Sequence, residues 1–190
     1  IYYQLISEVV SIPASNKRER YVIDVLDENN TRIQVVKLTS KGNLREKYFD
    51  RTFNKSETDE LRLYGLGGDD EFIFNGQMKS GIKLLIYGGP GDDYYVDHSE
   101  NQIVSKKLVG IFETETENEY DVSRRAHLHL TDDPIDNYYD YEKDYDWNRF
   151  YPGYFFSYNN DEGLFIGGGP KILRNGFRKF PAVMHYLRVN

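Results

Sequence analysis

The chain has 190 residues, a formal net charge of −7, 17 Tyr, 11 Phe and no Cys. This length suits one domain, or two small ones, with a buried core. The acidic balance argues against nucleic-acid partners, because phosphates require a basic surface, and the lack of Cys excludes disulfides and thiolate metal sites.

The residue types favour a mainly β protein. Aromatic and β-branched residues suit strands, and no apolar run is long enough for a membrane-spanning helix. The chain begins at Ile1 with neither an initiator Met nor a signal peptide, so we expect it to be a fragment of a longer protein.

Strands are predicted at residues 2–12, 21–26, 32–38 and 47–53. The first stops at Pro13, which cannot donate a hydrogen bond to a neighbouring strand. The second and third are rich in Val and Ile and are joined by a polar Asp-Glu-Asn-Asn segment, which predicts a hairpin.

A duplication follows, in which residues 61–74 are echoed by residues 84–97 at a constant offset of 23 residues. Each copy is an apolar strand ending in Tyr, a Gly-rich turn, an Asp pair and a second strand. Two such units can lie side by side. We therefore expect Tyr64 to pack on Tyr87, and Phe72 on Tyr95.

The duplicated turns admit two interpretations. Residues 88–96 fit the calcium-binding nonapeptide G-G-x-G-x-D-x-U-x with an aromatic residue at U, whereas the first turn has Leu66 at its second glycine position. Carbonyl and carboxylate oxygens are calcium ligands. The candidate calcium ligands are Asp69, Asp70, Asp92 and Asp93, with the carbonyls of Gly65, Gly67, Gly88 and Gly89.

The second interpretation is structural, with glycines forming tight turns and Asp side chains accepting hydrogen bonds from turn amides. It is favoured because a calcium β-roll needs many tandem nonapeptides, and here there are two, 23 residues apart.

Residues 1–112, closed by a strand at 102–112, are predicted to form an antiparallel or mixed β domain, a sandwich or β-roll with two stacked turns. The period-2 pattern predicts its core. The expected core residues are Val22, Val25, Val35, Leu61, Leu63, Phe72, Phe74, Leu85 and Ile86.

Residues 113–152 are predicted to be an acidic, aromatic connector. Residues 113–121 are expected to be exposed, and the aromatic part to form an irregular, ordered cover over the sheet, because each ring can bury a large area. The alternative is a carbohydrate-binding surface. Its stacking residues would be Tyr141, Tyr145 and Trp147.

His127 and His129 suggest a second alternative, a small metalloenzyme. On a strand both imidazoles share one face, with Asp132 and Asp133 close behind, and two His with a carboxylate can hold zinc. An ordinary amphipathic strand with His facing solvent explains the same pattern and is favoured.

The tail, residues 153–190, contains strand-like runs at 153–158, 163–173 and 182–189. The last two are expected to pair as an antiparallel hairpin across Asn175-Gly176. Its apolar face is expected to be covered by the sheet domain or by a second copy of the chain.

Two segments of this tail resemble the opening strands of surface-antigen barrels of outer-membrane assembly proteins. They are Asn-Asn-Asp-Glu-Gly-Leu-Phe-Ile-Gly-Gly-Gly at 159–169 and Gly-Phe-Arg-Lys-Phe-Pro at 176–181. The barrel that these segments resemble is the version found at the C-terminal end of large Bacteroidetes proteins that begin with a calcineurin-like metallophosphoesterase domain. Segments 48–53, 57–70, 133–134 and 139–141 are similar to the β linker domain of the same proteins, so the resemblance covers roughly residues 20–190.

The resemblance implies a non-catalytic linker module of the cell envelope, on the periplasmic or surface side of the outer membrane, with the barrel cut off at Asn190. In that family the hydrolytic metal site lies in the phosphoesterase domain, whose motifs do not occur here, so no catalytic residue and no cofactor is expected beyond the candidate calcium. The expected partners are the upstream hydrolase domain, the downstream barrel and, through the C-terminal hairpin, a second copy. The membrane would be contacted only through the missing barrel.

Overall fold

The computed structural model describes residues 7–76, 81–98, 108–114, 118–122, 126–131, 149–161, 163–174 and 183–186. It is mainly β, with mixed and antiparallel sheets, which confirms the predicted fold class. Within these residues no helix has the length and hydropathy that crossing a membrane requires. The chain divides into two compact units, residues 1–139 and 140–190.

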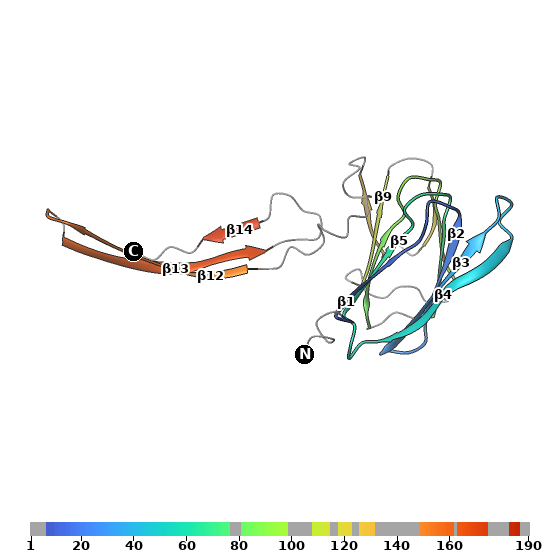
Figure 1. The fold of residues 1–190 in the computed structure, drawn as a ribbon, viewed down its shortest axis with the longest axis horizontal. Coiled ribbons are helices and arrows are strands. Elements are labelled where there is room, and N and C mark those ends of the chain that lie inside the picture. Colours follow the sequence, from blue (N-terminus) through green and yellow to red (C-terminus); the bar gives the residue numbers. More distant parts are fainter. Residues whose placement is uncertain are drawn as a thin grey trace. The chain divides into compact units, whose positions relative to one another are not determined.

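The first unit is built from two sheets (Figure 1). One is wholly parallel, in the order β1, β5, β7, β9, β11, and the other has the order β10, β8, β6, β2, β3, β4. The strands are β1 (Val9–Pro13), β2 (Glu19–Val25), β3 (Asn30–Leu38), β4 (Leu44–Asn54), β5 (Glu60–Tyr64), β6 (Glu71–Asn75), β7 (Lys83–Tyr87), β8 (Tyr94–Asp97), β9 (Val109–Glu113), β10 (Glu119–Asp121) and β11 (His127–Leu130).

The chain passes from one sheet to the other and back, so the unit is a two-sheet β-solenoid. One coil consists of a strand in the first sheet, a turn, a strand in the second sheet and a return loop. Strands β5 and β7 pair in parallel with Leu61 opposite Leu84, and β6 and β8 pair with Phe72 opposite Tyr95. The duplicated segments therefore lie side by side, as predicted.

The solenoid has further coils on both sides of the duplication. Strands β1 and β2 form an earlier coil, and the predicted hairpin leaves β2 as β3 and continues into β4 before the chain returns to β5. Strands β9, β10 and β11 continue both sheets past residue 112, where the sequence placed the end of the β domain. Part of the predicted exposed connector is thus strand β10, and Glu113 is buried.

The core lies between the two sheets. Of the residues predicted to form it, Val35, Leu61, Leu63, Phe72, Phe74, Leu85 and Ile86 are buried. Val25 is only partly buried. The prediction for Val22 is wrong, because β2 points Tyr21 and Ile23 into the core and Val22 away from it. A one-residue shift in a strand exchanges the two faces.

Aromatic rings stack along each sheet, one ring per coil. The first ladder runs through Tyr64, Tyr87, Phe112 and His129, with centroid separations of 4.9, 4.5 and 4.5 Å. The second runs through Tyr21, Phe72, Tyr95 and Tyr120, at 4.8, 4.9 and 5.3 Å. The predicted contacts of Tyr64 with Tyr87 and of Phe72 with Tyr95 are confirmed as steps of these ladders.

The second unit contains an antiparallel sheet of β12 (Arg149–Asn159), β13 (Gly163–Arg174) and β14 (Val183–Tyr186). The predicted antiparallel pairing of the last two strands is confirmed, whereas Asn175-Gly176 lies outside the described residues. Pairing starts with Arg174 opposite Val183, so more than these two residues connect the strands.

One face of the β12–β13 sheet is continuously apolar. Cross-strand partners on this face include Phe156 with Ile166 and Tyr158 with Leu164. Their exposed fractions are high, 77% and 75% for the first pair and 69% and 63% for the second. These side chains are exposed among the described residues, and their expected cover by the sheet domain or by a second copy stays a prediction.

Candidate functional site

The Gly-rich turns that lead from the first sheet to the second lie on top of one another. The N–H of Gly65 donates to the carbonyl of Tyr87 at 2.8 Å, and the N–H of Gly68 donates to the carbonyl of Pro90 at 3.1 Å. Parallel pairing therefore continues through the turns, and residues at equivalent positions form columns.

One column is made of buried carboxyl side chains, Glu19, Asp70, Asp93 and Glu113, which we call the inner carboxyl column. Asp70 Oδ1 accepts the N–H of Glu19, and Asp93 Oδ1 accepts the N–H of Asp70, both at 2.7 Å. Asn118 Oδ1 accepts the N–H of Asp93 in the same way, also at 2.7 Å. Each side chain thus fixes the turn of the preceding coil, and the hydrogen bonds to turn amides that the structural interpretation predicts are present at Asp70 and Asp93.

Glu113 enters the column from the end of β9. Its Oε1 accepts the hydroxyl of Tyr95, and its Oε2 accepts the N–H of Thr114 at 3.0 Å and the amide of Asn118 at 3.2 Å. A Cβ on Gly88 would lie 1.6 Å from this Oε1 and 2.1 Å from Asp93 Oδ2. Glycine is needed at position 88 because the two carboxyl groups occupy the space of a side chain.

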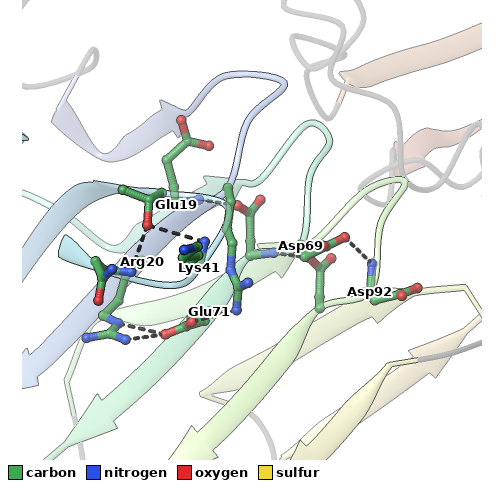
Figure 2. Close-up of polar contacts among 11 residues, drawn as sticks. Glu19, Arg20, Lys41, Asp69, Glu71 and Asp92 are labelled. Carbon is green, nitrogen blue, oxygen red and sulfur yellow. Dashed lines mark hydrogen bonds and ion pairs between the residues drawn. The ribbon is translucent and has the colours of Figure 1, made fainter. Parts of the chain in front are cut away.

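The other two predicted aspartates, Asp69 and Asp92, are exposed and form an outer pair. Asp69 Oδ1 accepts the N–H of Asp92 at 3.3 Å (Figure 2). Beside them Glu71 pairs with Arg20 at 2.6 Å and with Arg18 at 3.0 Å. Figure 2 shows Glu19 pointing away from Arg20 and Glu71, toward the other side of β2. The four aspartates therefore belong to two separate sites.

Burial disfavours the charged form of the inner carboxyl groups. It raises the pKa of Asp70 to about 9, although the N–H of Glu19 opposes the shift. Burial also raises the pKa of Asp93 to about 10, with a further increase from its hydrogen bond to Glu113. The pKa values of Glu19 and Glu113 are raised for the same main reason.

Three oxygens of the column have no hydrogen-bond donor while the carboxyl groups are ionised, namely Glu19 Oε2, Asp70 Oδ2 and Asp93 Oδ2. The side chains of Asp93 and Glu113 are hydrogen-bonded to each other, which requires a proton between them. When Asp93 carries that proton, its Oδ2 acts as a donor and no longer needs one. The column must therefore be neutralised, by protons or by a cation.

The histidines of the metalloenzyme alternative lie together on β11. Their ring centroids are 4.0 Å apart, and the His129 ring stacks on Phe112 as a member of the first aromatic ladder. Among the described residues no three His, Asp or Glu side chains are arranged to hold a metal. Asp132 and Asp133, like Tyr141, Tyr145 and Trp147 of the carbohydrate-binding alternative, lie outside the described residues.

Sequence reasoning missed Glu19, Glu113 and Asn118. Glu19 and Asn118 carry a usable signal, because an acidic or Asn residue stands two positions before an aromatic ring in each coil: Glu19 and Tyr21, Asp70 and Phe72, Asp93 and Tyr95, Asn118 and Tyr120. Glu113 carries none, since its role depends on the coil pairing that places it against Gly88.

Comparison with family models, curated proteins and solved structures found no match for this chain.

Proposed function

We propose that this chain is a non-catalytic structural module of a larger cell-envelope protein, which connects an upstream hydrolase domain to a downstream outer-membrane barrel. The observation that carries the proposal is the two-faced sheet of the second unit. Its strands β12 and β13 have 11 and 12 residues, long enough for a tilted strand to cross the apolar part of a bilayer.

The two faces of this sheet differ as the outer and inner faces of a membrane barrel wall do. One carries Phe150, Tyr154, Phe156, Tyr158, Leu164 and Ile166, all at least 63% exposed. The opposite face includes Ser157, the glycines at 153, 163, 167 and 169, and the exposed Tyr151, and the register places Phe155 and Phe165 at positions of the same face. Alternation of apolar residues toward lipid with small or polar residues toward the lumen is typical of membrane strands.

The first unit supports the connecting role. Its parallel coils and stacked rings form a β-solenoid in which each coil contacts its neighbours, and such modules hold their ends at a fixed separation. A solenoid followed by membrane-type strands suits a spacer between a soluble domain and a barrel.

The reading frame that encodes the chain provides one test. The proposal expects metallophosphoesterase motifs before Ile1 and a series of amphipathic strands after Asn190. A frame without either sequence would refute it.

Vesicle flotation provides a second test. The chain, extended to include the strands that the proposal expects after Asn190, is mixed with phosphatidylcholine vesicles and centrifuged through a density gradient. We expect it to float with the lipid, because a closed barrel leaves no unpaired strand edge in the bilayer. Phe156→Lys should abolish flotation, because a Lys on the lipid side costs about 2–4 kcal/mol at the bilayer midplane. Ser157→Lys, one residue along on the opposite face, is the matched control and should still float. Wild-type protein that stays at the bottom of the gradient contradicts the assignment, as does equal loss in both variants.

A further inference from the structure

The inner carboxyl column places one buried carboxyl group after another along the stack of coils. All four of its members are 1% exposed or less. Water therefore does not stabilise a charge on them, and a buried ionised carboxyl group needs a compensating charge or hydrogen-bond donor. The outer pair, Asp69 and Asp92, is exposed to water and stands outside this arrangement.

Asp93 and Glu113 meet at the boundary between two coils, where strands β7 and β9 pair in parallel. The space beside Gly88 holds both Asp93 Oδ2 and Glu113 Oε1. The two side chains are hydrogen-bonded to each other, and a carboxyl pair bonded in this way shares one proton. The other donors to Glu113 are neutral, namely the hydroxyl of Tyr95, the N–H of Thr114 and the amide of Asn118.

The charges that act on the column are mostly of its own sign. Asp70 faces Glu19, Asp69 and Glu113, and Asp93 faces Asp70 and Glu113. The cations Lys17 and Lys37 act on Glu19, at the first end of the column. The neighbouring hydroxyls belong to Tyr21, Tyr48, Tyr95 and Tyr120, whose pKa values burial and these carboxyl groups raise.

Protons suit this set of groups better than a metal ion does. Among the described residues no three acidic or His side chains are arranged to hold a metal, and Oδ1 of Asp70 and of Asp93 already accepts a turn amide. Burial raises the pKa of Asp70 to about 9 and that of Asp93 to about 10. Both groups are therefore protonated at neutral pH in the folded chain and ionised in the unfolded chain.

We propose that the inner carboxyl column is a proton-dependent lock between coils, in which the proton shared by Asp93 and Glu113 holds the coil of β9, β10 and β11 on the duplicated coils. Loss of this proton leaves two carboxylates in contact beside Gly88, and their repulsion loosens the stack from its β11 end. Because the pKa values are higher in the folded chain, the stabilisation is complete below about pH 4 and is lost as the pH rises toward 9–10. The lock does not depend on the proposed connecting function.

Urea denaturation of the whole chain at several pH values between 7 and 8.5 tests the lock. Each group that is protonated only in the folded chain lowers the folding equilibrium constant about tenfold per pH unit. With Asp70 and Asp93 both protonated, we expect a fall of about 100-fold per unit in the wild type and in the exposed control Asp92→Asn. Asp93→Asn should fall only about tenfold per unit, because its amide donates to Glu113 at every pH while its Oδ1 still accepts the N–H of Asp70.

Two measurements on the wild type need no variant. Refolding in a pH-stat at pH 7.5 should take up at least one proton per chain. Hydrogen exchange, corrected for the intrinsic effect of pH, should show strands β9 and β11 losing protection at pH 8.5 before β5 and β7. Equal pH slopes for the wild type and Asp93→Asn would overturn the proposal, as would refolding without proton uptake or a loss of protection that begins at β5.

Discussion

Leu66 adopts a backbone conformation that normally belongs to glycine. Its φ is 72°, and the equivalent residue of the next coil, Gly89, has a φ of 93°. The left-handed region costs a residue with a Cβ roughly 1–2 kcal/mol. The first turn therefore follows the same path as the second despite its different sequence, at the expense of local strain.

Leu66→Gly should raise the free energy of unfolding by about 1 kcal/mol, because it removes this strain. Gly89→Ala is the reciprocal change and should lower it, since the new Cβ would also lie 2.6 Å from the carbonyl oxygen of Leu66. Urea denaturation followed by circular dichroism measures both. A destabilised Leu66→Gly would mean that the contacts of the Leu66 side chain outweigh the backbone strain.

The hydroxyl of Tyr95 is a second feature whose effect belongs to one residue. It donates to Glu113 inside the column, whereas its neighbour Tyr94 is 37% exposed. Tyr95→Phe should cost about 1–3 kcal/mol, because it removes a donor from a buried carboxyl group. Tyr94→Phe should change stability by less than about 0.5 kcal/mol. Equal urea midpoints for the two variants would show that Glu113 does not need this donor.

At the scale of elements, the stacked turns determine how closely neighbouring coils approach. Glycine is essential only where the next coil occupies the space of a side chain. Gly88 is such a position, whereas a Cβ on Gly67 would make ordinary contacts, the nearest at 3.4 Å from the Pro90 carbonyl. Two glycines of the duplicated turns therefore differ in structural importance.

Gly88→Ala should lower the free energy of unfolding by about 1–3 kcal/mol, because its Cβ would force the side chains of Glu113 and Asp93 to move. Gly67→Ala should stay within about 0.5 kcal/mol of the wild type. Thermal melting of the two variants and the wild type measures this packing effect. A tolerated Gly88→Ala would show that Glu113 can leave the column at little cost.

Local pattern was sufficient to predict the duplicated strands, the β2–β3 hairpin and the ring contacts of Tyr64 with Tyr87 and Phe72 with Tyr95. The coils outside the duplication were not predicted, because the β3–β4 hairpin separates β2 from its partner β6 by 51 residues. The inner carboxyl column was predicted only in part, at Asp70 and Asp93. Adjacent aspartates look alike in sequence, and strand alternation alone does not reveal which of them is buried.

At the scale of the whole molecule, the two units differ in what holds them together. The buried core draws all its members from residues 10–126, between the sheets of the first unit. Among the described residues of the second unit, Phe156, Tyr158, Leu164 and Ile166 are each at least 63% exposed. The first unit therefore has the core of an independently folding domain.

A chain ending at Tyr139 should keep the main melting transition of the full chain, with Tm changed by no more than about 4 °C. It should also aggregate less, because the exposed apolar face is removed. Circular dichroism melts and sedimentation velocity measure the two effects. Loss of the cooperative transition would show that residues 140–190 contribute to the core.

The parallel register of the solenoid gives it a second property, a length that is counted in coils. Neighbouring parallel strands lie about 4.8 Å apart, so each coil advances the stack by that distance. The β3–β4 hairpin adds residues between β2 and β5 without adding a step, since β1 still pairs with β5 and β2 with β6. Residues inserted between coils leave the span unchanged, whereas gain or loss of one 23-residue repeat changes it by one step. The number of coils therefore sets the length of the first unit along the stacking direction.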